Sequence, residues 1–198
     1  MSKILSILSL VAILSFTIAD NNKDKKDAIN YFKETQRDLT KEVAGLSEAQ
    51  LTWKAADSVW SIADCIEHIA ISEKNIFDWA MATLKEPANA AKRSELKLDD
   101  AAVKKMLSDR SKKMKAPETF KPTGQFGNSA GGMKAFNERR EALISYMKNT
   151  QDDLRNHFAT TAISLLDTYQ VFIFLSAHTK RHTLQIAEIK TMPGFPAP

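Results

Sequence analysis

Apolar residues recur at helical spacing in four segments of the chain. They cover residues 29–46, a segment that begins at Ser61, residues 133–147 and residues 165–189. In each segment the apolar positions three and four apart fall on one face of a helix, and most charged positions fall on the other face. No stretch alternates apolar and polar residues for long enough to predict a strand. The pattern therefore predicts an all-α protein, a four-helix bundle, whose core contains Phe32, Ile69, Phe136 and Leu175.

Capping patterns predict where two of these helices begin. Residues 61–64 (SIAD) and 164–167 (SLLD) both have a serine followed three residues later by an acid, so each pair can satisfy free backbone N–H groups at a helix start. The helix after Ser61 is expected to end before Pro87, and the last helix is expected to end near Thr191.

The segment between the second and third helices has a weaker pattern. Asp99 or Asp100 is placed to cap a short helix there. Prolines and glycines then crowd residues 117–132, which predicts a loop that reaches as far as Gly132.

The N-terminus has the pattern of a secretory signal. Lys3 supplies a positive charge, residues 4–18 are almost all apolar, and Ala19 ends a small-residue cleavage motif. Cleavage there gives a signal peptide of residues 1–19 and a secreted or periplasmic single domain of residues 20–198. An uncleaved N-terminal anchor is the alternative, but about 15 apolar residues are fewer than the roughly 20 that span a bilayer. We therefore expect no stable membrane anchor after cleavage.

Charge and cysteine content narrow the classes of partner. The net charge of +4 falls to +3 when Lys3 is removed with the signal, and no dense basic stripe interleaved with aromatic residues is present. This argues against binding to nucleic acid. Cys65 is the single cysteine, so no intramolecular disulfide can form. A homodimer stays open, because no surface pattern defines an interface.

Two histidines suggest chemistry in the fourth segment. His178 and His182 are four residues apart, so on a helix they share a face, with Cβ atoms about 5–6 Å apart. Leu175 and Ile186 lie on the same face, which directs the imidazoles into the core. Imidazole nitrogen is a good ligand for divalent zinc, nickel or iron. The alternative is a pair of core histidines that bond to polar neighbours, and a third ligand would decide between the two.

His68 is the candidate third ligand. It lies on the inward side of the second helix, so it completes a three-imidazole set if that helix faces the fourth one. Three protein nitrogens on an ion that prefers four ligands leave one position for water, which is the catalytic pattern. His157 lies in a polar segment and is predicted to be a surface residue.

The histidine motifs resemble those of the DinB-like (damage-inducible) family of metal-binding four-helix-bundle proteins. The resemblance covers about residues 25–196 and is carried by residues 60–69 (WSIADCIEHI) and 178–186 (HTKRHTLQI). It implies a metal site made of one histidine on the second helix and a His-x-x-x-His pair on the fourth. It also implies activities that range from metal-dependent hydrolases to thiol-dependent S-transferases and isomerases. The family name does not imply DNA binding.

Four further residues lie within about a turn of a candidate ligand and could orient an imidazole from outside the ligand set. They are Asp64, Cys65, Glu67 and Glu188. Each carboxylate could instead be a solvated helix residue, and Cys65 a small buried hydrophobic residue. Thr179 occupies the position where a zinc protease of the His-Glu-x-x-His type has its glutamate, which excludes that class.

Together these features predict a metal-dependent, hydrolase-like enzyme that acts on a small molecule. The alternatives are a thiol-dependent S-transferase and a bundle that binds metal or a ligand without turnover. Small thiols are abundant chiefly in the reducing cytosol. For an exported protein, hydrolysis is therefore the favoured prediction over thiol transfer. No catalytic residue is assigned from the sequence.

Overall fold

The computed structural model describes the backbone of residues 2–161 and 164–197 and the side chains of residues 22–161 and 164–197. The side chains of the predicted signal segment, residues 1–19, lie outside the described ones, so its cleavage stays a prediction. Within the described part of the chain, no helix combines the length and apolar character needed to cross a membrane.

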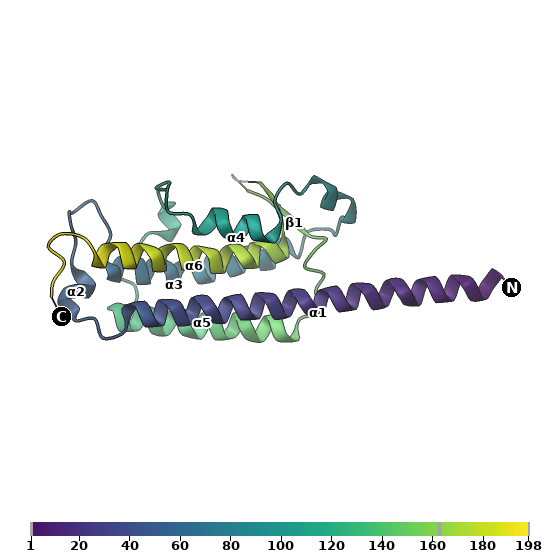
Figure 1. Ribbon diagram of the computed structural model, residues 1–198, viewed down its shortest axis with the longest axis horizontal. Coiled ribbons are helices and arrows are strands. Elements are labelled where there is room, and N and C mark those ends of the chain that lie inside the picture. Colours follow the sequence, from purple (N-terminus) through teal and green to yellow (C-terminus); the bar gives the residue numbers. More distant parts are fainter. Residues whose placement is uncertain (1, 162–163, 198) are drawn as a thin grey trace.

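Four long helices run side by side (Figure 1). They are α1 (Ser2–Val43), α3 (Ile62–Thr83), α5 (Ser129–Asn149) and α6 (Thr168–Lys190). Helices α1 and α3 each contact both α5 and α6, which places α1 and α3 at opposite corners. The predicted four-helix bundle is confirmed.

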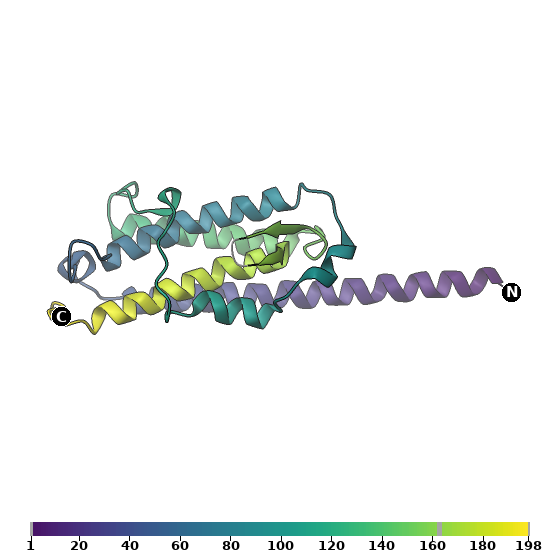
Figure 2. The same ribbon diagram turned by 90° about the horizontal axis from the view of Figure 1, so that it is seen from above.

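Shorter elements connect the long helices. Helix α4 (Asp100–Ser108) packs along the outside of α6, as the view from above shows (Figure 2). Helix α2 (Glu48–Thr52) and the 3₁₀ turns η1 (Ala90–Glu95) and η2 (Glu118–Phe120) lie in the connections. The short helix predicted at Asp99 is confirmed, with the Asp99 carboxylate accepting the N–H of Ala102 at 2.7 Å.

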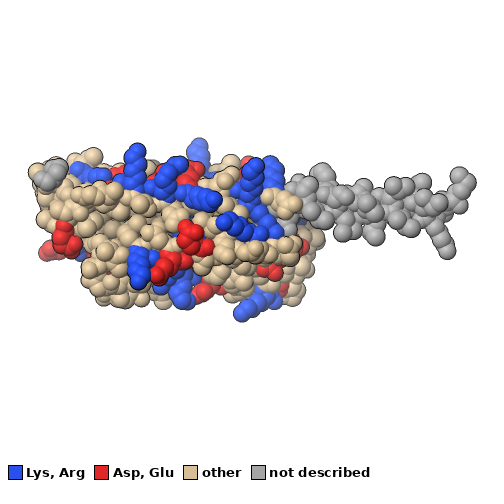
Figure 3. Space-filling view, turned by 90° about the horizontal axis from the view of Figure 1, so that it is seen from below, with Lys and Arg blue, Asp and Glu red and all other residues tan. Residues whose placement is uncertain are grey.

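The outer sides of the helices carry charges of both signs. On the face of α1 and α5 that Figure 3 shows, Lys and Arg side chains lie beside Asp and Glu. Surface pairs include Lys23–Asp27 at 3.2 Å and Arg37–Asp38 at 3.0 Å. Exposed pairs of this kind contribute little to stability, so the bundle depends on its interior.

Helix α3 begins where the sequence predicts. The Ser61 hydroxyl accepts the Asp64 N–H at 3.0 Å, and the Asp64 carboxylate accepts the Ser61 N–H at 2.9 Å. This reciprocal pair satisfies two N–H groups that a helix start leaves free. The cap fixes the start of α3, so that His68 falls in its second turn, and the helix ends at Thr83, before Pro87.

Helix α6 begins three residues later than predicted. Its N-cap is Asp167, whose carboxylate accepts the Gln170 N–H at 2.7 Å, and the predicted cap Ser164 instead bonds to Thr161. Residues Leu165–Asp167 form strand β2, antiparallel to β1 (Phe158–Thr160). The expectation of no strand is therefore wrong here, because a three-residue strand is too short to show alternation.

Helix α5 begins earlier than predicted. The Asn128 side chain accepts the Gly131 N–H at 2.8 Å, so both Gly131 and Gly132 belong to the helix and not to the preceding loop. A Cβ atom at position 132 would lie 2.9 Å from Cγ2 of Ile66 on α3. This glycine therefore permits the close approach of α5 to α3.

The interior consists of two apolar clusters separated by a polar layer. Phe32 and Leu175 belong to one cluster, and Ile69 and Phe136 belong to the other. All four are buried as predicted, but they do not share one core. The residues between the clusters are buried and polar, and the guanidinium of Arg140 is the largest group among them.

Truncation of Leu175 tests this description of the core. The side chain is 1% exposed, so Leu175→Ala is expected to lower the free energy of unfolding by about 2–5 kcal/mol through lost burial and a cavity. Leu184→Ala is the matched control, because Leu184 lies on the same helix and is 41% exposed. Urea denaturation measures both. A loss below about 0.5 kcal/mol for Leu175→Ala, the range of surface substitutions, would contradict the assignment.

Candidate metal centre

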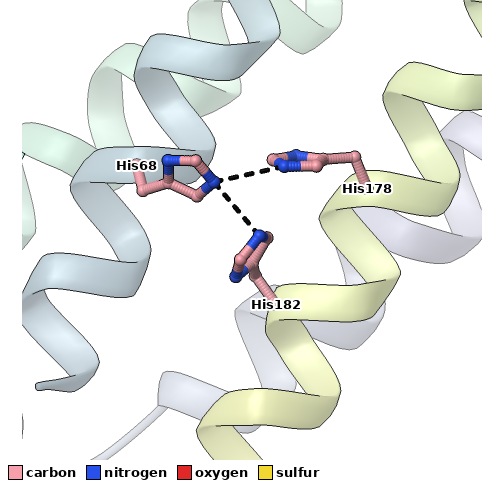
Figure 4. A group of neighbouring side chains, drawn as sticks. All are labelled: His68, His178 and His182. Atoms are coloured by element: carbon pink, nitrogen blue, oxygen red, sulfur yellow. Dashed lines mark hydrogen bonds between the residues drawn. The ribbon is translucent and has the colours of Figure 1, made fainter. Parts of the chain in front are cut away.

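Three imidazoles meet between α3 and α6 (Figure 4). The Nε2 atom of His68 lies 3.1 Å from Nε2 of His178 and 3.1 Å from Nε2 of His182. The ligand atoms of the three residues all lie within 4.8 Å of one another. Tetrahedral zinc with bonds of about 2.0–2.1 Å holds its nitrogen ligands about 3.3 Å apart. The three side chains therefore have the spacing of a ligand set for one ion.

His68 is oriented by the segment that follows α4. Its Nδ1 atom lies 2.6 Å from the carbonyl oxygen of Phe120 in η2. A carbonyl only accepts hydrogen bonds, so Nδ1 carries the proton and donates it. In the neutral ring this leaves a lone pair on Nε2, which faces the other two imidazoles.

His182 is oriented in the same way by its own helix. Its Nδ1 atom lies 2.9 Å from Oε1 of Gln185. The Arg110 guanidinium also donates to this atom at 3.1 Å, which identifies it as the amide oxygen. Arg110 is in turn held by Glu188, at 2.7 Å between Nη2 and Oε2. The result is again Nδ1–H pointing away from the set and an Nε2 lone pair pointing into it.

In this arrangement the Nε2 atoms of His68 and His182, each with a lone pair directed at the other, lie 3.1 Å apart. They repel each other unless a cation or a proton lies between them. Burial lowers the pKa of His68, and burial together with the neighbouring His68 lowers the pKa of His182 to about 3. Burial and the other two histidines hold the pKa of His178 well below its usual value. Near neutral pH the imidazoles are therefore uncharged, which is the form that binds a metal ion.

Aromatic rings surround the three imidazoles. The Trp60 ring lies 4.7 Å from His68 and 6.0 Å from His182, between ring centroids. Phe174 stacks on His178 at 6.3 Å, and Phe120 lies 6.5 Å from His68. These half-buried rings limit the access of water to the centre. They also lower the local dielectric constant, which strengthens interactions with an ion.

A groove lies beside the centre, between α3 and η2. It has a volume of about 520 Å³ and is lined by Asn75, Ile76, Asp78, Trp79, Thr119 and Phe120. Phe120 also supplies the carbonyl that orients His68, and Trp79 packs edge-on against Phe174 at 6.0 Å. Phe120 therefore connects the groove to His68, although none of the three histidines lines the groove.

Of the four residues predicted to orient an imidazole, Asp64 and Cys65 have other roles. The Asp64 carboxylate caps α3 and pairs with Lys54 at 2.7 Å. Cys65 is fully buried, and burial raises the pKa of its thiol. A thiol in this environment behaves as a small hydrophobic residue, which was the alternative interpretation.

Glu67 and Glu188 are placed differently from each other. The Glu67 carboxylate accepts the N–H groups of Thr123, Gly124 and Gln125, each at 3.0 Å, so it anchors the loop after η2. Glu188 is linked to His182 by hydrogen bonds through Arg110 and Gln185. The sequence predicted the residue and missed the two that connect it to His182.

The roles of three residues of the site were not predicted from the sequence. Gln185 lies three positions after His182, so helical spacing could have suggested it. Arg110 and the Phe120 carbonyl come from a segment without a clear pattern, and a carbonyl leaves no sequence signal. The fourth histidine, His157, is half-buried away from the set, with Nδ1 2.7 Å from the Glu86 carbonyl oxygen.

Comparisons with known proteins agree with the fold. The family model for the DinB superfamily matches residues 31–186, a span that includes all three histidines, and the chain belongs to that superfamily. No curated protein sequence matched the chain. Among solved structures it is similar to YfiT from Bacillus subtilis, with a TM-score of 0.57 and 16% identity over 87% of this chain and 89% of YfiT. YfiT is described as a probable metal-dependent hydrolase with an unusual four-helix bundle topology.

The lowered pKa of His182 predicts how the stability of the metal-free protein depends on pH. Its folded-state pKa of about 3 lies below the unfolded value of about 6.5, so between these values the unfolded state binds more protons. The stability that this neutral imidazole contributes is therefore fully present above about pH 6.5 and is lost as the pH drops below that value. Between pH 7 and pH 5 the protonation of this histidine in the unfolded state should lower the free energy of unfolding by about 2 kcal/mol.

Chemical denaturation at several pH values, with a chelator present, measures this effect. His182→Gln removes the titrating ring and keeps a polar side chain, so its stability should fall less steeply with acid by about that amount. Parallel curves for the two proteins would contradict the burial of a neutral imidazole.

Proposed function

We propose that the protein is a metal-dependent hydrolase that acts on a small molecule, with one divalent ion held by His68, His178 and His182. The observation that carries this proposal is that the Nε2 atoms of His68 and His182 lie 3.1 Å apart in a buried site, with their lone pairs facing each other. Protonation is disfavoured there, so a metal ion is the cation that best relieves the repulsion. Membership of the DinB superfamily and the fold shared with YfiT support the same reading.

The residues of this chain fit such an ion in number, donor type and orientation. Three neutral imidazoles suit zinc, nickel or ferrous iron, and the donor set alone does not choose among them. A divalent ion of this kind, when bound, acts as a Lewis acid and lowers the pKa of coordinated water to about 7. Phe120 and Gln185 hold two imidazoles in the ligating orientation, and the aromatic rings restrict bulk water.

The groove beside the centre suggests where a substrate lies. Its volume of about 520 Å³ falls in the range of about 300–1,000 Å³ that is typical of small-molecule sites. Ile76, Trp79 and Phe120 give the groove an apolar side, and its other lining residues are polar, so we expect a small substrate with an apolar or aromatic part and a polar group. Its hydrolysable group would then point towards the imidazoles.

The cellular location of the protein is part of the same proposal. Export under the predicted signal of residues 1–19 would place the protein in the secreted or periplasmic compartment. Thiol cosubstrates are scarce there, which favours water as the attacking group. No general base is assigned, because the carboxylates of Asp64 and Glu67 are held by other partners.

The metal site makes a direct prediction. The purified protein should bind one divalent ion per chain, and His68→Ala, His178→Ala and His182→Ala should each lose most of it. His157→Ala is the matched control, because that histidine lies outside the set and should leave metal content unchanged. Elemental analysis after equilibration with zinc gives the result. Equal metal content in all five proteins would rule out the centre.

The activity prediction concerns ester substrates. The metal-loaded protein should hydrolyse an aryl ester such as 1-naphthyl acetate with a lower KM than ethyl acetate, and a chelator should abolish the catalysed hydrolysis of both. Trp79→Ala should raise KM for the aryl ester, because it removes part of the groove wall. Trp53→Ala is the control, since Trp53 packs against Phe195 away from the groove.

The same assay separates the alternative functions. It is run beside a reaction of 1-chloro-2,4-dinitrobenzene with several small thiols. Metal-dependent turnover only with thiols would replace hydrolysis by thiol transfer. Metal binding with no turnover in either assay would indicate a binding protein.

A further inference from the structure

Ser72 carries a buried hydroxyl that has no partner. Its side chain is 1% exposed, and within the described part of the chain its Oγ atom forms no hydrogen bond. Buried polar atoms are nearly always hydrogen-bonded, because an unpaired one has lost its contacts with water and gained none in return. A serine that stays unpaired at this depth suggests a partner that is not part of the protein.

The hydroxyl also does not bond to its own helix. In helices, serine and threonine commonly donate to the carbonyl four residues earlier. Thr83 donates to the Trp79 carbonyl at 3.0 Å, and Thr183 donates to the Thr179 carbonyl at 2.9 Å. The equivalent acceptor for Ser72 is the His68 carbonyl, and Ser72 does not use it. The Ser72 hydroxyl is thus free to bind another group.

Helix geometry places Ser72 next to the metal centre. It follows His68 by four residues on α3, so the two side chains share a face, with Cβ atoms about 5–6 Å apart. Ile76, which lines the groove, lies four residues further along the same helix. Ser72 therefore lies between His68 and Ile76 along this face of α3.

Arg140 shows which residues of α6 lie at the same height along the bundle as Ser72. Its Nη2 atom donates to Glu73 at 2.9 Å and to Thr179 at 3.0 Å. Glu73 directly follows Ser72, and Thr179 directly follows His178 in the sequence. Ser72 therefore lies level with His178, the second ligand of the set.

We propose that the Ser72 hydroxyl donates a hydrogen bond to an oxygen atom of the ligand that completes the coordination of the ion. This inference rests on the proposed function, since three imidazoles leave one position open on a tetrahedral ion. A hydroxyl donates strongly to a charged carboxylate oxygen and only weakly to sulfur. Ser72 thus selects oxygen ligands, such as the carboxylate released by ester hydrolysis, over thiolates.

The experiment compares an oxygen ligand with a sulfur ligand in one variant. The cobalt(II)-loaded wild type and Ser72→Ala are titrated with acetate and, separately, with 2-mercaptoethanol at a single neutral pH. The visible absorption of cobalt reports binding of either probe. Ser72→Ala should weaken acetate binding about tenfold, the value of one hydrogen bond to a charged group, and leave 2-mercaptoethanol binding unchanged.

Ser129→Ala provides the matched control. The Ser129 hydroxyl is also buried without a partner, but it lies in the first turn of α5, outside the imidazole set. Its removal should change the affinity for neither probe. Thermal unfolding of the metal-free proteins gives a second readout. Ser72→Ala should have the same Tm as the wild type or a higher one, because it removes an unpaired buried hydroxyl.

The outcomes separate this inference from the proposed function. Unchanged acetate affinity in Ser72→Ala overturns the role of Ser72, as does equal weakening of both probes, which would indicate a damaged site. A clear loss of Tm also overturns it, because the hydroxyl would then stabilise the fold itself. A wild type that takes up no cobalt overturns the metal centre, and the role of Ser72 falls with it.

Discussion

A single buried guanidinium, that of Arg140, holds the four long helices in register. Arg140 lies on α5 and is fully buried, as is its partner Glu73 on α3, at 2.9 Å between Nη2 and Oε2. Its Nη1 atom donates at 2.7 Å to the carbonyl of Phe32 and at 2.7 Å to the hydroxyl of Thr35, both on α1. On α6 it donates to Thr179. Sliding any one helix along the bundle would leave a buried charge without its partners, which is strongly unfavourable.

This register is what brings the three histidines together. The bond from Arg140 to Thr179 sets the height of His178 and His182 on α6, and the bond to Glu73 sets the height of His68 on α3. Burying the pair has a cost in desolvation, and burial raises the pKa of Glu73 although Arg140 opposes the shift. The two apolar clusters on either side supply the stability that offsets this cost. The polar layer contributes specificity of register more than stability.

Local patterns in the sequence were enough for the ligands that share a helix. The spacing of His178 and His182 and the cap at Ser61 depend on residues within one or two turns. The predicted start of α6 was wrong because two capping signals overlap at residues 164–170. The pairing of β1 with β2 selects the later one. Propensity cannot resolve that choice, since a contact between strands decides it.

Other parts of the site could not have been predicted from local patterns. His68 faces α6 because of how the helices pack. From the sequence alone, its place in the set depended on the unproven assumption that the second helix faces the fourth. The family resemblance supplied the three ligands together, but it did not supply their orientation. The Phe120 carbonyl and Arg110 reach the imidazoles from a segment whose course is set by tertiary contacts, so neither leaves a sequence signal.

That segment helps to hold the three imidazoles in their orientation. After α4 the chain crosses from α6 to α3, and side chains at both ends hold it. Arg181 on α6 donates to the carbonyls of Asp109 and Lys112, and the Glu67 carboxylate on α3 accepts N–H groups of residues 123–125. Between these anchors the Phe120 carbonyl fixes the His68 ring. Because hydrogen bonds to the protein hold the His68 and His182 rings, little conformational entropy would be lost when an ion binds. The repulsion between their lone pairs is then relieved by the ion, so the fold favours a bound cation through its own geometry.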